Sequence, residues 1–279
     1  MRRGLHAVRR GLIVYSLPFL LFAVAAAAEP VGPASPRSAE ADAETYARCM
    51  KLAKDDPGAA QTLAQAWHNR GGAHPAEHCA AVALITLGKY REAATRLGAL
   101  AQAMATAPAA LRAGVLDQAG QAWLLAGDPV RAYAAAGAAV TLSPGDPDLL
   151  IDRAEAAASA GYLDKAVGDL DRVLKAQPDR VDALIYRASA YRALDRLDPA
   201  LADIERALAH APGSASALLE RGNIRRLNGD LAGARRDWEQ VGRIAPGTPA
   251  DMAARANIEH LALDGSAAPP AKTTGPRQP

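Results

Sequence analysis

The stretch that decides the fold is LIYRASAYRALDRLDPALADIERALAHAP, residues Leu184–Pro212. Its closing proline belongs to a series spaced by thirty-four residues, which comprises Pro144, Pro178, Pro212 and Pro246. Two more series keep this interval: Ala132, Ala166, Ala200 and Ala234, and then Gly127, Gly161 and Gly229 with Asp195 in the place of a glycine. A fixed period of this length predicts a solenoid, in which each unit buries its apolar face against its neighbours.

The composition favours helices packed through small side chains. Half of the 279 residues are hydrophobic, but only 4% are aromatic. Alanine supplies about half of the apolar residues, and it is the best helix former. The chain is long enough to bury a sizeable core. These features indicate an all-helical array rather than a sheet core rich in valine, isoleucine and phenylalanine.

The N-terminus carries an expected export signal. Four arginines (Arg2, Arg3, Arg9 and Arg10) precede an apolar run at 12–24 and three small residues at 26–28. This order predicts a signal peptide over residues 1–28, cleaved after Ala28. An uncleaved membrane anchor is the alternative, but the run is shorter than the ~20 residues of a span and contains Pro18. Arg9 and Arg10 loosely resemble a twin-arginine signal, although the strongly apolar run favours the ordinary export route.

The mature chain has an almost balanced charge. Removal of residues 1–28 takes away four arginines, so 32 basic residues become 28 against 30 acidic ones, a net charge near −2. The basic character of the full chain therefore belongs to the export signal. We expect no nucleic-acid partner and no membrane span after cleavage.

The two cysteines, Cys49 and Cys79, both lie in the mature chain. A single pair in an exported protein predicts a disulfide, which would contribute about 3–4 kcal/mol by closing a loop of roughly thirty residues. The alternatives are a free pair or a metal site with the nearby histidines His68, His74 and His78. Adjacent helical residues such as His78 and Cys79 point about 100° apart, so they do not easily reach one ion. We expect the disulfide and no metal site.

The period divides the chain into parts. In order, we expect a disordered leader (29–40), a degenerate helix pair (41–73), a divergent repeat (74–112), four regular repeats (113–248), a capping helix (249–263) and a disordered tail (264–279). The leader and the tail contain too few apolar residues to fold. An insertion of about five residues at 109–114 predicts a longer loop or an extended helix end.

The repeat resembles the tetratricopeptide repeat. Its best match is the unit 181–214, with Leu184, Ala188, Tyr191, Ala200, Ile204, Ala207 and Pro212. The unit 113–146 has Leu116, Ala119, Gly120 and Trp123 in matching positions, whereas Ala157 and Arg225 replace the expected aromatic residue in two units. The resemblance covers about residues 74–263. It implies a right-handed superhelical all-α solenoid of antiparallel helix pairs, whose concave groove usually binds a peptide or partner protein. Together with the expected signal peptide, it indicates an exported bacterial protein.

Two charged series depart from the family pattern. The basic series is Arg153, Arg187, Arg221 and Arg255, and the acidic series is Asp169, Asp203 and Asp237. The unit 113–146 has Ala119 and Ala135 in these positions, so both charges are present or absent together. We expect a structural ladder in which each aspartate faces two arginines, since a guanidinium can engage a carboxylate on two sides. The alternative is a site for a phosphate or carboxylate ligand.

The resemblance also implies which residues line the groove. They lie on the first helix of each unit and are Asp117, Gln121, Asp148, Ile151, Glu155, Asp182, Ile185, Ser189, Arg192, Leu219, Asn223 and Arg226. The early part is acidic, and the late part contains Arg192 and Arg226. Apolar residues between charges suit an extended or helical segment of another protein. An ordinary solvated face is the alternative.

The sequence favours a binding protein over an enzyme. It contains no glycine-rich phosphate loop, no nucleophile elbow and no His-Glu-x-x-His zinc motif. We therefore expect a non-enzymatic periplasmic scaffold or adaptor that binds a protein or peptide in the cell envelope and uses no cofactor. The alternatives are a chaperone-like holder of exported chains and a docking subunit of an envelope enzyme complex.

Overall fold

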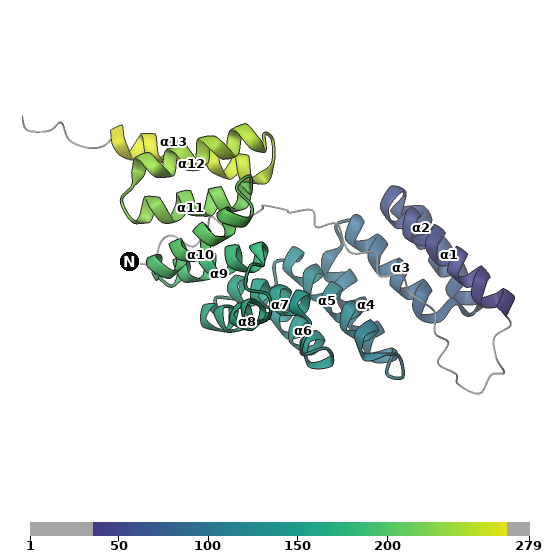
Figure 1. The fold of residues 1–279 in the computed structure, drawn as a ribbon. Coiled ribbons are helices and arrows are strands. Elements are labelled where there is room, and N and C mark those ends of the chain that lie inside the picture. The colour runs from purple at the N-terminus through teal and green to yellow at the C-terminus, as the bar shows by residue number, and fades with distance from the viewer. Residues whose placement is uncertain (1–35, 267–279) are drawn as a thin grey trace, which may run out of the picture. The chain divides into compact units, whose positions relative to one another are not determined.

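The computed structural model describes residues 36–266, and it describes side chains from 39 to 262. These residues form two compact units, 36–178 and 179–266, and all their regular structure is helical. The expected signal peptide, residues 29–35 of the leader and residues 267–279 of the tail lie outside the described residues. The all-α helical solenoid expected from the sequence is confirmed (Figure 1). The handedness of the superhelix and the domain bounds stay predictions.

The first unit contains the helices up to α8. They are α1 (Pro36–Asp55), α2 (Pro57–Trp67), the π-helical turn η1 (His68–Gly72), α3 (Ala73–Thr86), α4 (Tyr90–Ala103), α5 (Ala109–Leu125), α6 (Pro129–Leu142), α7 (Pro147–Ser159) and α8 (Leu163–Ala176). The second unit contains α9 (Val181–Ala193), α10 (Leu197–His210), α11 (Ala215–Leu227), α12 (Leu231–Ile244) and α13 (Pro249–Ser266). Among these described helices, none has the length and apolar character needed to cross a bilayer.

Local sequence sets where several helices begin. Asp56, Asp128 and Asp146 are N-cap residues, and each is followed by a proline at the first helical position. The Asp128 carboxylate, for example, accepts a hydrogen bond from the Arg131 backbone N–H at 3.2 Å. An aspartate cap satisfies a backbone donor that lacks a partner in the helix, and proline there loses no hydrogen bond.

The periodic small residues explain how the helix pairs pack. Ala132, Ala166, Ala200 and Ala234 are all 0% exposed. The four residues of the glycine series have φ values of 73°, 81°, 60° and 83° at Gly127, Gly161, Asp195 and Gly229. The turn between the helices of a pair therefore requires the left-handed conformation, which Asp195 adopts at a steric cost that glycine avoids.

Two helices begin earlier than the period alone predicts. Helix α5 has 17 residues where α7, α9 and α11 have 13, so the insertion at 109–114 extends a helix. Helix α1 begins at Pro36, inside the expected leader. The last helix, α13, ends at Ser266, three residues beyond the expected Leu263.

The expected disulfide joins α1 to α3. The Cys49 and Cys79 sulfur atoms are bonded, with their Cα atoms 6.0 Å apart, and both residues are fully buried. The neighbouring His78 is also buried, and burial lowers its pKa. Its Nδ1 lies 2.9 Å from the Tyr46 hydroxyl and its Nε2 lies 2.8 Å from the Gln118 carbonyl. The two ring nitrogens of His78 thus connect α3 to α1 and to α5.

Candidate binding groove

The first helices of successive pairs form one face of each unit. Helix α5 contacts α7 directly, and in the second unit α9 contacts α11 and α11 contacts α13. The second helices of successive pairs make fewer direct contacts with one another. The first-helix face is therefore the more tightly packed face of each unit. This is the face to which the groove residues were assigned.

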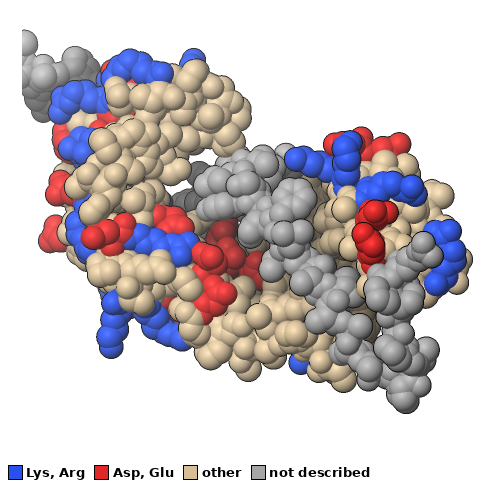
Figure 2. Space-filling view, turned by 45° about the vertical axis from the view of Figure 1, so that its right-hand side comes forward, with Lys and Arg blue, Asp and Glu red and all other residues tan. Residues whose placement is uncertain are grey.

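In the first unit this face contains a small acidic pocket between α5 and α7. The lining residues are Asp117, Gly120, Gln121, Leu124, Ala136, Asp152, Glu155 and Ala156. The Gln121 side chain donates to the Asp117 carboxylate at 2.9 Å. No carboxylate of the pocket forms an ion pair with a described residue. Figure 2 shows acidic side chains gathered near the middle of the view.

Burial changes the acidity of these carboxyls. The pKa of the Asp117 carboxyl is raised to about 9, mainly by burial and secondly by the negative charge of Asp152. Burial followed by the charge of Asp152 raises the pKa of Glu155 to about 7. The pKa of Asp152 is also raised by burial, although a hydrogen bond with Asp117 opposes this. At neutral pH the pocket therefore holds a proton on Asp117, which donates to Asp152.

Only some of the predicted groove residues of this unit line the acidic pocket. Asp117, Gln121 and Glu155 line the pocket, and Asp148 is exposed in the first turn of α7. Ile151 does not line it, because its side chain is only 5% exposed and belongs to the core. The sequence analysis missed Asp152. The signal that points to it is a fourth series with the repeat interval, in which Gln118, Asp152, Tyr186 and Glu220 supply a polar group each time.

In the second unit the first-helix face carries a network of polar side chains in which a carboxylate is neutralised by an arginine. The Arg192 guanidinium bonds to the Glu220 carboxylate, and the Asn223 amide donates to Glu220 at 3.3 Å. Asn257 of α13 donates to Asn223 at 3.0 Å. Ser189 lies 3.5 Å from Arg192. Predicted residues are thus connected through Glu220 and Asn257, two residues that the sequence analysis missed.

The remaining predicted residues of the second unit form none of the bonds of this network that are described above. The Asp182 carboxylate accepts hydrogen bonds of 2.9 and 3.1 Å from Arg180. Ile185 and Leu219 are half-buried, and Arg226 is exposed.

The residues of the predicted ladder form ion pairs within helix pairs. Arg153 bonds to Asp169 through two nitrogens, and Arg187 and Arg221 bond in the same way to Asp203 and Asp237. The Arg187 contacts are both 2.7 Å. The three aspartates are 4–5% exposed. Each pair therefore fastens the first helix of a pair to the second.

The second contacts of the ladder differ from the expectation, because among the described residues no aspartate of the acidic series is paired with the arginine of the following unit. Asp169 receives its second guanidinium from Arg172 of its own helix, at 3.7 Å. Asp237 receives its second guanidinium from Arg225 of α11, at 2.8 Å, rather than from Arg255. Arg255 instead bonds to Asp251 of its own helix at 2.8 Å. Asp251 also accepts from the Gly247 backbone N–H and so holds the start of α13. The Asp251 carboxylate, one helical turn before Arg255, thus takes the place that was expected for Asp237.

Comparisons with known proteins give the fold. No protein-family model matches the sequence, and no curated protein matches it. Among solved structures, a tetratricopeptide repeat protein from Parabacteroides merdae has a TM-score of 0.67 at 16% identity, over 80% of this chain and 89% of that one. A thermophilic tetratricopeptide repeat protein from Thermus thermophilus has a TM-score of 0.55 at 20% identity, over 68% of this chain and 100% of that one.

A third similar structure also contains tetratricopeptide-like repeats. It is a putative kinesin light chain with nearly identical repeats from Podosopora anserina, with a TM-score of 0.51 at 19% identity. It covers 60% of this chain and 92% of that one. At these identities the likeness concerns the fold alone. The described residues have the fold of tetratricopeptide repeat proteins.

Proposed function

We propose that this protein is a non-enzymatic scaffold, which binds a segment of a partner protein along the first-helix face. The observation that carries the proposal is the acidic pocket between α5 and α7, where Asp117, Asp152 and Glu155 meet without a basic partner among the described residues. Open faces of helical solenoids are commonly binding surfaces. The pocket gives this one a chemical preference.

The preferred partner carries a lysine or arginine on an extended or helical segment. An ammonium group is compact and donates three hydrogen bonds, so it suits a small pocket lined by carboxylates. It would replace the proton that Asp117 holds at neutral pH. Binding should therefore release a proton, and affinity should rise with pH toward the Asp117 pKa of about 9.

Two features support a role in the cell envelope. Residues 1–28 have the order of an export signal. The Cys49–Cys79 disulfide suits an oxidising compartment, because disulfides are rare where thiols are kept reduced. We propose that the mature protein works in the periplasm.

The test is a selection from a random dodecapeptide display library, followed by anisotropy titrations of the enriched peptides. We expect peptides with lysine or arginine, whose affinity falls at least tenfold in the double variant Asp117→Asn with Asp152→Asn. A matched control, Asp171→Asn with Glu239→Gln, removes two exposed acidic groups outside the pocket. Equal loss in both variants, or enrichment without basic residues, would contradict the proposal. Circular dichroism checks that each variant keeps its helices.

A further inference from the structure

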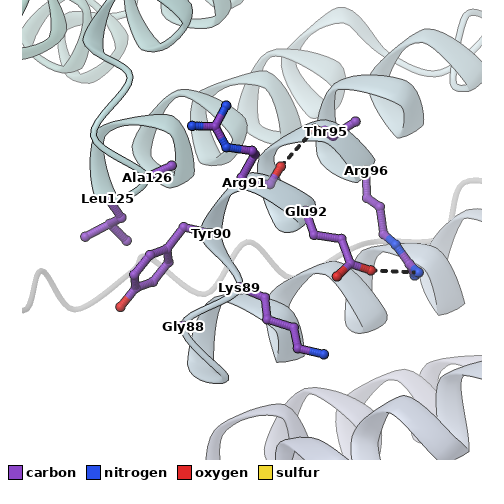
Figure 3. A pocket seen from close by; sticks show the side chains of 9 residues that line it. All are labelled: Gly88, Lys89, Tyr90, Arg91, Glu92, Thr95, Arg96, Leu125 and Ala126. Atoms are coloured by element: carbon purple, nitrogen blue, oxygen red, sulfur yellow. Dashed lines mark hydrogen bonds and ion pairs between the residues drawn. The ribbon is translucent and has the colours of Figure 1, made fainter.

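A second surface lies where α4 begins and α5 ends (Figure 3). It is an open pocket of about 670 Å³. Its lining residues are Gly88, Lys89, Tyr90, Arg91, Glu92, Thr95, Arg96, Leu125 and Ala126. They belong to the turn after α3, the first two turns of α4 and the end of α5. None of them lines the acidic pocket, so the two surfaces can be changed separately.

One side of this pocket is apolar. In Figure 3 the Tyr90 ring and the Leu125 side chain lie next to each other, opposite Lys89, Glu92 and Arg96. Leu125 is 39% exposed, and the nearby Leu87 in the preceding turn is 44% exposed. Exposed apolar side chains gathered in a hollow often mark an interaction site.

The other side carries unbalanced positive charge. Arg96 is paired with Glu92 at 3.2 Å and with Glu77 at 3.8 Å. Lys89 and Arg91, in contrast, form no ion pair with a described residue. The Arg91 guanidinium lies over the Trp123 ring, 5.7 Å from its centroid. This contact holds a cation at the surface without neutralising it.

The start of helix α4 adds to this charge. Its N-cap residue is Lys89, which makes no side-chain capping bond to the first turn. The free backbone N–H groups of a helix start carry partial positive charge and favour an anion. Glu92 in the first turn offsets a part of it, but its carboxylate is engaged by Arg96.

We propose that this surface, made by Lys89, Tyr90, Arg91 and Leu125, docks an acidic segment of a partner protein with one apolar anchor. The anchor, a leucine or an aromatic side chain, would enter the hollow beside Tyr90 and Leu125. Carboxylates on either side of it would meet Lys89, Arg91 and the start of α4. Charge complementarity selects this occupant. An anionic membrane surface fits less well, because clusters that bind such a surface contain about four to eight basic residues and this one contains two unpaired cations.

The surface therefore has the opposite preference to the acidic pocket. A scaffold with both could hold a basic and an acidic segment at once. This inference does not depend on the proposed groove function, since the lining residues are different.

The first step of the experiment removes the charged carboxylates of the acidic pocket, so that this pocket does not select peptides. A random dodecapeptide library is selected on the double variant Asp117→Asn with Asp152→Asn. We expect enriched peptides rich in aspartate and glutamate around one leucine, phenylalanine or tryptophan. Their binding is measured by anisotropy and by the fluorescence of Trp123, which is partly exposed while Trp67 and Trp238 are buried.

Substitutions then locate the peptides. Lys89→Glu with Arg91→Glu should weaken binding at least tenfold, and Leu125→Gln about fivefold. The matched control, Lys175→Glu with Arg236→Glu, changes the net charge equally at exposed positions outside this pocket and should have little effect. Added salt should weaken binding by the wild-type surface but not by the Lys89→Glu, Arg91→Glu variant.

Four outcomes would overturn the proposal. One is enrichment of no peptides or of basic ones, and another is equal loss of affinity in the test and control variants. A third is sedimentation with vesicles of phosphatidylglycerol and phosphatidylcholine that requires Lys89 and Arg91, which would indicate a membrane. The fourth is self-association, measured by sedimentation velocity, that the Lys89→Glu, Arg91→Glu variant abolishes.

Discussion

Asp152 in the first unit and Glu220 in the second occupy the same position of the repeat, two periods apart. Glu220 bonds to Arg192, which lies 28 residues earlier. The residue 28 positions before Asp152 is Leu124, so Asp152 has Asp117 beside it and no cation. One substitution at one repeat position thus decides whether a carboxylate is neutralised within the fold or left for a ligand.

Carboxylates therefore have two different roles within the same repeat. Neutralised carboxylates such as Asp203 and Glu220 connect helices and should contribute to stability. The carboxylates of the acidic pocket oppose one another and should reduce stability. Binding sites often carry such a local cost, because groups arranged for a ligand are not satisfied without it.

The largest expected effect comes from a neutralised carboxylate. Asp203→Ala leaves the Arg187 guanidinium without its two short contacts in a largely buried position. We expect a loss of about 3 kcal/mol, because the variant removes the buried carboxylate that binds the guanidinium through two nitrogens. Urea denaturation should show this loss, and Glu239→Ala at an exposed position of α12 serves as control. Equal midpoints for the two variants would show that the ion pairs do not hold the helices together.

A smaller effect should follow from making the second unit resemble the first. Arg192→Leu leaves the buried Glu220 without its guanidinium partner. We expect a loss of about 2 kcal/mol at neutral pH. Urea denaturation at neutral pH tests this, and a midpoint equal to that of the wild type would contradict it.

The acidic pocket should make stability depend on pH in the opposite sense to acid unfolding. The folded pKa of Asp117, about 9, lies far above the usual value of an aspartate, so the folded chain binds this proton more tightly than the unfolded chain does. The stabilisation of the folded state by this proton is fully present below about pH 4 and is lost as the pH rises toward 9. Asp152, Asp146 and Asp148 add to the shift through their charges.

Asp117→Asn should remove this dependence. We expect the variant to be more stable than the wild type at pH 8 by about 1 kcal/mol, because the pocket is partly solvated and its groups share a proton. The difference should decrease toward pH 5. Denaturation of both proteins across this range is the measurement. A variant that is less stable than the wild type at pH 8 would mean that Asp117 is a structural group.

The smallest effect concerns the turn between α9 and α10. Asp195 has a φ of 60° where the other regular repeats have glycine. Asp195→Gly should raise stability by about 0.5 kcal/mol, since it relieves the steric cost of the left-handed conformation but adds freedom to the unfolded chain. The same replacement at the nearby Asp198, in the first turn of α10, should reduce stability. If both variants are destabilised, the turn does not strain Asp195.

Much of the fold could be predicted from the period alone. The alanine, glycine and proline series identified the helix pairs because each series marks a close contact or a turn that only small or conformationally special residues allow. The cysteine pair likewise predicted the disulfide. The early start of α1 could not be predicted, because proline and serine occur in both disordered segments and first helical turns.

The candidate site could be predicted only in part. Asp117, Gln121 and Glu155 were found because they lie on the first helices. Asp152 and Glu220 were missed, since their position in the repeat was assigned to neither the groove nor the ladder. Ile151 and Arg255 were placed wrongly for another reason: which side chain is buried, and which carboxylate lies closest to a guanidinium, depends on packing between helices that the repeat pattern does not specify.

The most direct test transfers the arginine of the second unit into the first. Leu124→Arg places a guanidinium at the repeat position of Arg192, next to Asp152 and Asp117. The measurement is the affinity of a lysine-bearing peptide selected on the wild type. We expect at least a tenfold loss of affinity, together with a lower pKa for Asp117. Unchanged affinity in a folded Leu124→Arg variant would contradict the claim that the unneutralised pocket is the binding site.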